Sequence, residues 1–158
     1  RYGFSAGPLF LMGHSAGAHI ACLLALDERY RTLAHLDAAS IRGVIGLSGV
    51  YRFRPENSEL HSAIFASAGP DFETVKPINY VGPNQVPLLM LHGSKDTLVG
   101  YKTAQRMYDA AVAAGQKASL HAQKGYGHVR PLFDFLPFMP NHQKTMALLL
   151  AFMTEHRA

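Results

Sequence analysis

A serine between two glycines stands at the junction of two apolar segments near the start of the chain. The apolar residues 8–12 predict a buried strand, and the Ala- and Leu-rich residues 16–27 predict a buried helix. Between them lies the pentapeptide Gly13-His14-Ser15-Ala16-Gly17. A turn this sharp strains its central residue, and we expect glycine at 13 and 17 because neighbouring backbones leave no room for side chains. The pentapeptide predicts a strand, a tight turn and a helix, with the serine hydroxyl at the tip.

Three more strands and two more helices are predicted further along the chain. Residues 44–47, 88–91 and 119–122 are predicted strands, and residues 101–114 and 142–156 have helical spacing of apolar positions. The last helix is expected to bury one side that carries Met146, Leu149, Leu150 and Met153. Strands that alternate with helices predict an α/β fold, in which a mostly parallel sheet is flanked by helices.

The segment between the second and third predicted strands is irregular. Residues 51–86 hold several Pro and Gly residues and one weak helical stretch at 58–66. We expect an excursion above the sheet, where open α/β folds bind their ligands. The chain of 158 residues is 48% hydrophobic and 16% charged, which predicts one packed globular domain.

An aspartate and a histidine follow the later predicted strands directly. Asp96 comes after the third strand and His128 after the fourth, so both lie with Ser15 beyond the carboxyl ends of strands. A serine hydroxyl is a weak nucleophile unless a base takes its proton and a third group orients that base. The chain order Ser15, Asp96, His128 is the order that the strand-turn-helix motif predicts. The N–H of Ala16, at the start of the helix, is the expected oxyanion donor.

Four strings of this sequence resemble the C-terminal half of an α/β-hydrolase of the small esterase and lipase group. They are LMGHSAGAHIA, VIGLSGVY, LLMLHGSKDTLV and GYGH, and they are similar to feruloyl-esterase-like and kynurenine-formamidase-like carboxylesterases. The resemblance implies that Ser15 is the nucleophile, Asp96 the orienting acid and His128 the base. It also implies that residues 1–158 form the C-terminal part of one α/β-hydrolase domain.

The same resemblance implies a segment that supplies further parts of the site. Members of this group begin with four more strands and a His-Gly-Gly type loop that gives the second oxyanion donor. The strand at 9–12 would then be an exposed edge, and exposed apolar edges aggregate unless something covers them. We therefore expect either that the native protein is longer or that another chain completes the sheet.

These patterns predict that the complete protein hydrolyses small carboxylic esters through an acyl-enzyme. An arylformamidase or another amide hydrolase with the same three residues is an alternative, and a non-catalytic binding module with a vestigial triad is a second. Asp71 and Asp134 are alternatives to Asp96 as the acid, although neither follows a strand directly.

Substrate contacts are expected close to the nucleophile and the base. His14 and Tyr126 are candidate substrate-binding residues, although a side chain at the position of His14 commonly packs beside the sheet and loop packing explains Tyr126 equally well. The apolar loop at 133–139 either covers the core or forms an acyl-binding wall. Arg52 follows the string Ser-Gly-Val-Tyr, where relatives often carry an acidic residue, and a cation there would favour an anionic substrate.

Composition argues against several other functions. The net charge is +4, but the Lys and Arg residues are interspersed with acids and form no basic helix face, so no nucleic-acid binding is predicted. The single Cys22 allows no internal disulfide, and the nine histidines include no pair at zinc-binding spacing with a glutamate, so neither a metal nor another cofactor is predicted. The apolar run at 146–153 is far shorter than the about 20 residues of a membrane span.

Overall fold

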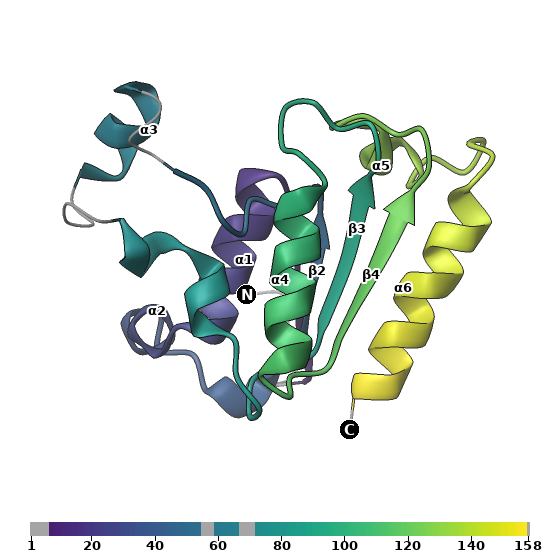
Figure 1. The fold of residues 1–158 in the computed structure, drawn as a ribbon. Helices are drawn as coiled ribbons and strands as arrows, with labels where there is room; N and C mark the ends of the chain where they lie inside the picture. Colours follow the sequence, from purple (N-terminus) through teal and green to yellow (C-terminus); the bar gives the residue numbers. More distant parts are fainter. Residues whose placement is uncertain (1–6, 55–58, 67–71, 158) are drawn as a thin grey trace, which may run out of the picture.

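The computed structural model describes residues 7–54, 59–66 and 72–157, and these form one parallel sheet with helices on both faces (Figure 1). The strands lie in the order β1 (Leu9–His14), β2 (Ile41–Leu47), β3 (Leu88–Gly93) and β4 (Ala118–Gln123). Each neighbouring pair is parallel, and Met12, Ile45, Leu89 and Ser119 form one row across the sheet. The predicted α/β fold class is therefore confirmed.

Six helices connect or follow these strands in the described residues. They are α1 (Ala16–Leu26), α2 (Glu28–Leu33), α3 (Glu59–Ile64), α4 (Lys102–Ala113), α5 (Arg130–Phe133) and α6 (His142–His156). The predicted helices at 16–27, 101–114 and 142–156 are confirmed, whereas the short helices α2 and α5 were not predicted. Residues 51–86 hold α3 and the short 3-10 helices η4 (Glu73–Val75) and η5 (Pro77–Tyr80), and no strand in their described part.

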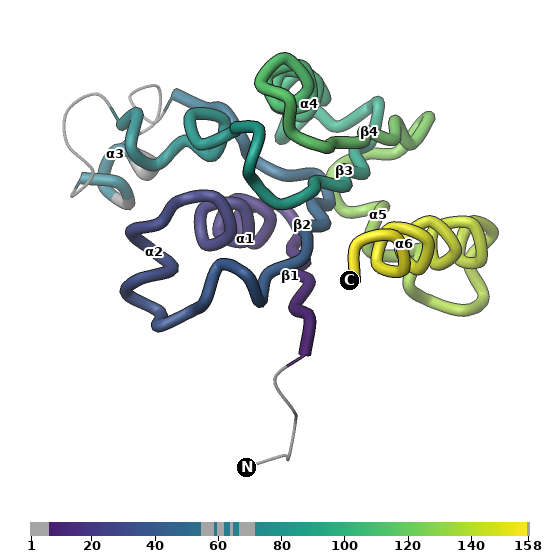
Figure 2. Tube along the Cα trace, turned by 90° about the horizontal axis from the view of Figure 1, so that it is seen from below, coloured from purple at the N-terminus to yellow at the C-terminus, as the bar shows by residue number. Residues whose placement is uncertain are grey.

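Each face of the sheet has its own hydrophobic core. Helices α1 and α4 cover one face and α6 covers the other, as Figure 2 shows along the strands. Alternate residues of β3 supply the two cores, so that Leu88 and Met90 face α1 and α4 while Leu89 and Leu91 face α6. Because both faces are covered, the central strands are apolar throughout rather than alternating.

The buried side of α6 is the predicted one except at Leu150, since Met146 and Met153 also pack against this core. Leu149 and Phe152 are 3% and 8% exposed and pack against the sheet, with Thr145 buried one turn earlier. Leu150 is 54% exposed, so its predicted place on the buried side is wrong. Successive helix residues lie about 100° apart, and the centre of the contact falls on Leu149 rather than on its neighbour.

Strand β1 lies at one edge of the sheet in the described part of the chain. Leu9 and Met12 on this strand are 41% and 51% exposed. That a further segment or another chain covers this edge stays a prediction. Across the described residues, no helix is both long enough and apolar enough to cross a membrane.

Candidate active site

Ser15 lies at the sharp corner between β1 and α1. Its φ of +55° and ψ of −119° are unusual for a residue with a side chain. The Ser15 N–H donates to the Leu47 carbonyl at 2.9 Å, which fixes the corner against β2. A Cβ on Gly13 would stand 2.2 Å from the carbonyl carbon of Gly17, so only glycine fits at position 13.

The steric reason predicted for Gly17 is wrong. A Cβ at that position would meet no described atom within 4 Å. Only one of the two glycines is crowded. A Cβ on Gly13 would point at the backbone of Gly17, whereas a Cβ on Gly17 would point into open space. The spacing of the motif therefore reflects a steric requirement at its first glycine.

Hydrogen bonds connect the side chains of Ser15, His128 and Asp96 in a row. His128 belongs to the base loop, residues 124–129, which joins β4 to α5. Its Nε2 lies 2.9 Å from Ser15 Oγ, and its Nδ1 lies 2.8 Å from Asp96 Oδ2. A carboxylate only accepts, so Nδ1 donates to Asp96 and Nε2 is free to accept the serine proton. The side chains of His128 and Asp96 are 11% and 0% exposed.

The Asp96 carboxylate accepts from donors on both oxygens. Oδ1 accepts the backbone N–H groups of Leu98 at 3.0 Å and Val99 at 2.8 Å. Burial raises the pKa of Asp96, but the hydrogen bonds from His128 and from the Val99 N–H outweigh it, so the pKa lies below its ordinary value. Asp96 is therefore held as an anion, which can orient an imidazole and stabilise its charged form.

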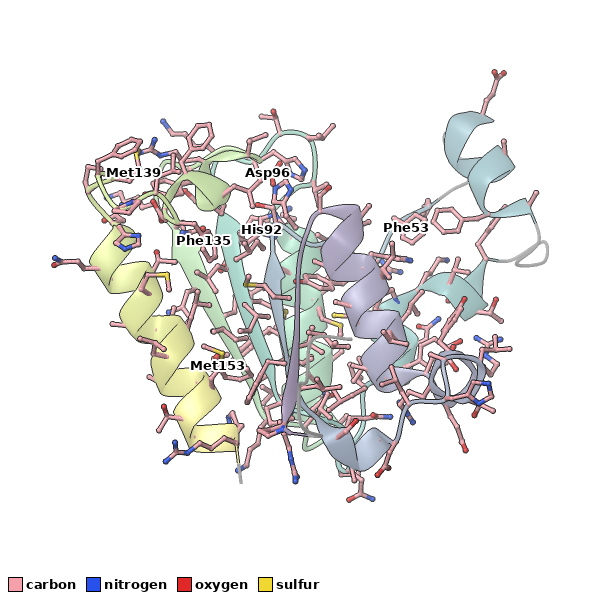
Figure 3. The ribbon with its side chains drawn as sticks, turned by 180° about the vertical axis from the view of Figure 1, so that it is seen from behind. Phe53, His92, Asp96, Phe135, Met139 and Met153 are labelled. Atoms are coloured by element: carbon pink, nitrogen blue, oxygen red, sulfur yellow. The ribbon has the colours of Figure 1, made fainter. Side chains whose placement is uncertain are left out.

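His92 lies beneath this carboxylate and donates to the Val99 carbonyl beside it. Figure 3 shows His92, near the end of β3, close to Asp96, which follows that strand. His92 Nε2 is 2.7 Å from the Val99 carbonyl and 3.2 Å from Asp96 Oδ2, and the side chain is 1% exposed. Burial lowers the pKa of His92, so near neutral pH the ring acts as a neutral donor. The sequence indicated only that His92 ends a strand near the acid, and it gave no signal for this contact.

A cavity of about 1060 Å³ opens beside Ser15 and Ala16. Ala16 is the first residue of α1, so its N–H is one of the donors that a helix leaves without an internal partner. Arg52 is the one Lys, Arg, Asp or Glu among the described residues that line the cavity. The other walls are mostly aliphatic or aromatic and include Ile20, Leu23, Leu24, Val50, Phe53 and Phe65.

One wall of the cavity is built from three rings. Phe53 (Figure 3) contacts His19 of α1 and Phe65 just after α3, with ring centroids 5.4 Å and 5.0 Å away, and the rings of His19 and Phe65 are themselves 5.8 Å apart. His19 Nδ1 lies 3.0 Å from the Val50 carbonyl, and burial lowers the pKa of His19. The prediction that His19 is a core residue is confirmed, since it is 6% exposed.

Of the two candidate substrate-binding residues, His14 contacts the base loop and Tyr126 belongs to it. His14 Nε2 lies 2.9 Å from the backbone carbonyl of His128. The Tyr126 hydroxyl donates to Asp134 Oδ1 at 3.0 Å. Neither His14 nor Tyr126 is among the described residues that line the cavity. Their roles in substrate binding stay predictions.

Asp134, one alternative acid, belongs to a different network. It is fully buried, and its Oδ2 accepts from Gln123 Nε2 and Thr145 Oγ1, both at 3.1 Å. Sequence reasoning missed this connection between the base loop and α6, because three of its members are ordinary polar residues. The other alternative acid, Asp71, lies outside the described residues.

The apolar loop at 133–139 divides between the core and the surface. Phe135 packs against the core beneath α6, whereas Phe138 is 79% exposed. None of the residues of this loop is among those that line the cavity in the described structure. Its role as an acyl-binding wall stays a prediction.

Comparison with known proteins gives a family and two curated relatives. A model of the BD-FAE family matches residues 1–110. Isoprenylcysteine alpha-carbonyl methylesterase ICME of Arabidopsis thaliana is 28% identical over 147 residues, which cover 80% of this chain and 34% of the relative. The probable enzyme of the same name from Oryza sativa subsp. japonica is 27% identical over 146 residues, covering 80% of this chain and 35% of the relative. The chain spans about a third of the length of these relatives.

Solved structures of esterases share the fold. Esterase 2 of the Planctomycetes species Thermogutta terrifontis superimposes with a TM-score of 0.70 at 22% identity, over 92% of this chain and 54% of that one. A truncated carbohydrate esterase from gut microbiota gives a TM-score of 0.77 at 15% identity, over 99% of this chain and 62% of that one. At these identities the likeness concerns the fold, which is that of the α/β-hydrolase esterases. With the family match over residues 1–110, this chain belongs to the BD-FAE family.

Proposed function

We propose that the complete protein is a carboxylic ester hydrolase in which Ser15, His128 and Asp96 act as nucleophile, base and orienting acid. The observation that carries the proposal is the pair of hydrogen bonds on the two nitrogens of His128, 2.9 Å to Ser15 Oγ and 2.8 Å to Asp96 Oδ2. A base between a hydroxyl and an oriented carboxylate is the arrangement that turns a serine into a nucleophile.

The proposed reaction has two steps. Ser15 Oγ attacks the ester carbonyl carbon while His128 Nε2 takes the hydroxyl proton, and the anion of Asp96 stabilises the imidazolium that forms. The Ala16 N–H, at the positive end of the α1 dipole, stabilises the charge that develops on the carbonyl oxygen. The proton then passes from His128 to the leaving alkoxide, and water hydrolyses the acyl-enzyme by the same route in reverse.

The cavity beside Ser15 supports an ester with an apolar part. Its aliphatic and aromatic walls match the usual lining of a small-molecule site, in which few polar groups fix the orientation. The curated relatives are named methylesterases, which supports an ester rather than an amide as the substrate.

The test measures hydrolysis of p-nitrophenyl esters with short acyl chains by the complete protein. Ser15→Ala is expected to abolish turnover and labelling by a fluorophosphonate, because no other residue in the scheme supplies the nucleophile. Asp96→Asn is expected to lower kcat by about 10³–10⁴-fold at an unchanged fold, since a neutral amide no longer stabilises the imidazolium. Turnover near the wild-type rate in Ser15→Ala would exclude the proposed mechanism.

A further inference from the structure

A second histidine contacts the base of the proposed reaction. His14, the last residue of β1, has its Nε2 2.9 Å from the backbone carbonyl oxygen of His128. A carbonyl only accepts, so Nε2 carries a proton and donates it to this hydrogen bond. The two imidazole rings also lie in contact, with centroids 4.8 Å apart and planes tilted by 50°. His14 therefore holds the backbone of the residue whose side chain contacts Ser15.

The backbone of His14 is itself fixed by the sheet. His14 lies opposite Leu47 in the parallel register of β1 and β2. The next N–H along the chain, that of Ser15, donates to the Leu47 carbonyl at 2.9 Å. His14 cannot shift without disturbing these strand contacts, so its imidazole offers a fixed donor at the carboxyl edge of the sheet.

The base loop is also held at residues on either side of His128. The carbonyl of Tyr126 accepts from the Lys95 N–H at 2.9 Å. Within the described part of the chain, the side-chain hydrogen bond to the backbone of His128 comes from His14. The contact spans 114 positions of the sequence, so it joins the nucleophile's corner directly to the base loop.

We propose that His14 is a positioning residue, which holds the backbone of His128 so that the imidazole stays within hydrogen-bond distance of Ser15 Oγ. The inference rests on the proposed ester hydrolysis. Residues 14 and 15 contact His128 at two places, one at its carbonyl and one at its ring, both at 2.9 Å. Proton transfer requires this short separation, and a displacement of about 1 Å costs up to about 100-fold in rate.

The role differs from substrate binding in what it predicts for the kinetic constants. The described cavity lining does not include His14, so its removal leaves the contacts to the substrate intact. Loss of one hydrogen bond changes the population of the productive arrangement by about threefold to tenfold. The loss is therefore expected in kcat, with KM unchanged.

Three substitutions of His14 in the complete protein separate the donor from the ring. The side-chain amide of His14→Gln extends about as far as Nε2 and donates, whereas the amide of His14→Asn is one methylene too short. His14→Leu keeps apolar bulk and has no donor. For a short-chain p-nitrophenyl ester, we expect His14→Asn and His14→Leu to lower kcat about threefold to tenfold, and His14→Gln to stay near wild type.

A histidine away from the site serves as the matched control. His121 is exposed on β4, and His121→Leu is expected to leave kcat and KM unchanged. Thermal unfolding of every variant separates a loss of folding from a loss of rate. If His14→Leu does not fold, the comparison of His14→Gln with His14→Asn decides, because the two amides differ only in length.

The rate of fluorophosphonate labelling of Ser15 gives a second readout, and it should follow the order of kcat. A raised KM at unchanged kcat would assign His14 to the substrate and overturn the proposal. Equal kcat in His14→Gln and His14→Asn would also overturn it, because the donor would then have no effect. If the wild-type protein turned over no ester, the proposed function would fail, and the labelling rates would still decide the role of His14.

Discussion

Gly93 is the position where one added methyl group would most directly displace the base loop. It is the last residue of β3, and the backbone of the base loop packs across it. A Cβ at Gly93 would stand 2.3 Å from the Tyr126 carbonyl oxygen and 2.8 Å from that of Gly127. These neighbours are backbone atoms, so they cannot rotate away as the end of a side chain can.

The magnitude follows from the movement that Gly93→Ala requires. Contacts to a Cβ need at least 3.0 Å, so the loop must retreat by about 0.7 Å at Tyr126, two residues before His128. The hydrogen bond from the Lys95 N–H to the Tyr126 carbonyl, now 2.9 Å, would lengthen in the same movement. Since about 1 Å of misplacement costs up to about 100-fold, we expect this movement of about 0.7 Å to lower kcat about 10-fold to 30-fold. Overpacking at a rigid site should also cost about 1–3 kcal/mol of unfolding free energy.

The assay compares Gly93→Ala with Gly82→Ala in the complete protein. The nearest atom to a Cβ at Gly82 is the flexible Gln85 Cγ at 3.7 Å, an ordinary contact, so this control should behave as wild type. Steady-state hydrolysis of a short-chain p-nitrophenyl ester gives kcat, and urea unfolding gives stability at the same temperature. A folded Gly93→Ala protein whose kcat lies within about twofold of the control would refute the argument that this contact sets the position of His128.

Two further predictions concern stability. Burial holds the pKa of His19 below its ordinary 6.5, so the unfolded chain takes up a proton there before the folded one does, and stability falls as the pH drops through 6.5 towards the folded pKa. His19→Gln should reduce the slope of unfolding free energy against pH below 6.5 by at most about 1.4 kcal/mol per pH unit. Urea unfolding at several pH values measures this slope, and an unchanged slope would contradict the lowered pKa of His19. Tyr126→Phe removes one donor from the fully buried Asp134 and should lower the free energy of unfolding by about 1–3 kcal/mol. The control Tyr108→Phe, at a partly buried position of α4, should change it little. Equal losses of unfolding free energy in the two variants would argue against the hydrogen bond.

Much of the fold could be predicted because its signals are local. The apolar runs, the helical spacing at 101–114 and 142–156, and the glycine before the serine each act within a few residues. The order of predicted strands and helices along the chain indicated an α/β architecture, and the parallel sheet confirms it. The short helices α2 and α5 were missed because four to six residues give too few periods to detect.

The site was predicted less completely. The sequence predicted that Ser15, Asp96 and His128 lie together, because each follows a strand and parallel strands bring their carboxyl ends to one edge. It did not predict which residues surround these three. His92 donates to the Val99 carbonyl and lies against the Asp96 carboxylate only because the loop from Asp96 to Val99 folds back over it. The surroundings of Asp134 were not predicted either: its carboxylate accepts from neutral donors of β4, the base loop and α6.

The sequence by itself determined the order of strands and helices, the sharp corner at Ser15 and the edge of the sheet where polar side chains gather. Those features depend on backbone preferences and on the period of apolar residues, which neighbouring positions specify. Tertiary structure alone decided that Leu150 of α6 is exposed and that His14 donates to the backbone of His128. These outcomes depend on contacts between segments that are distant in the chain. The residue pattern of one segment does not specify how close a distant segment lies in the folded protein.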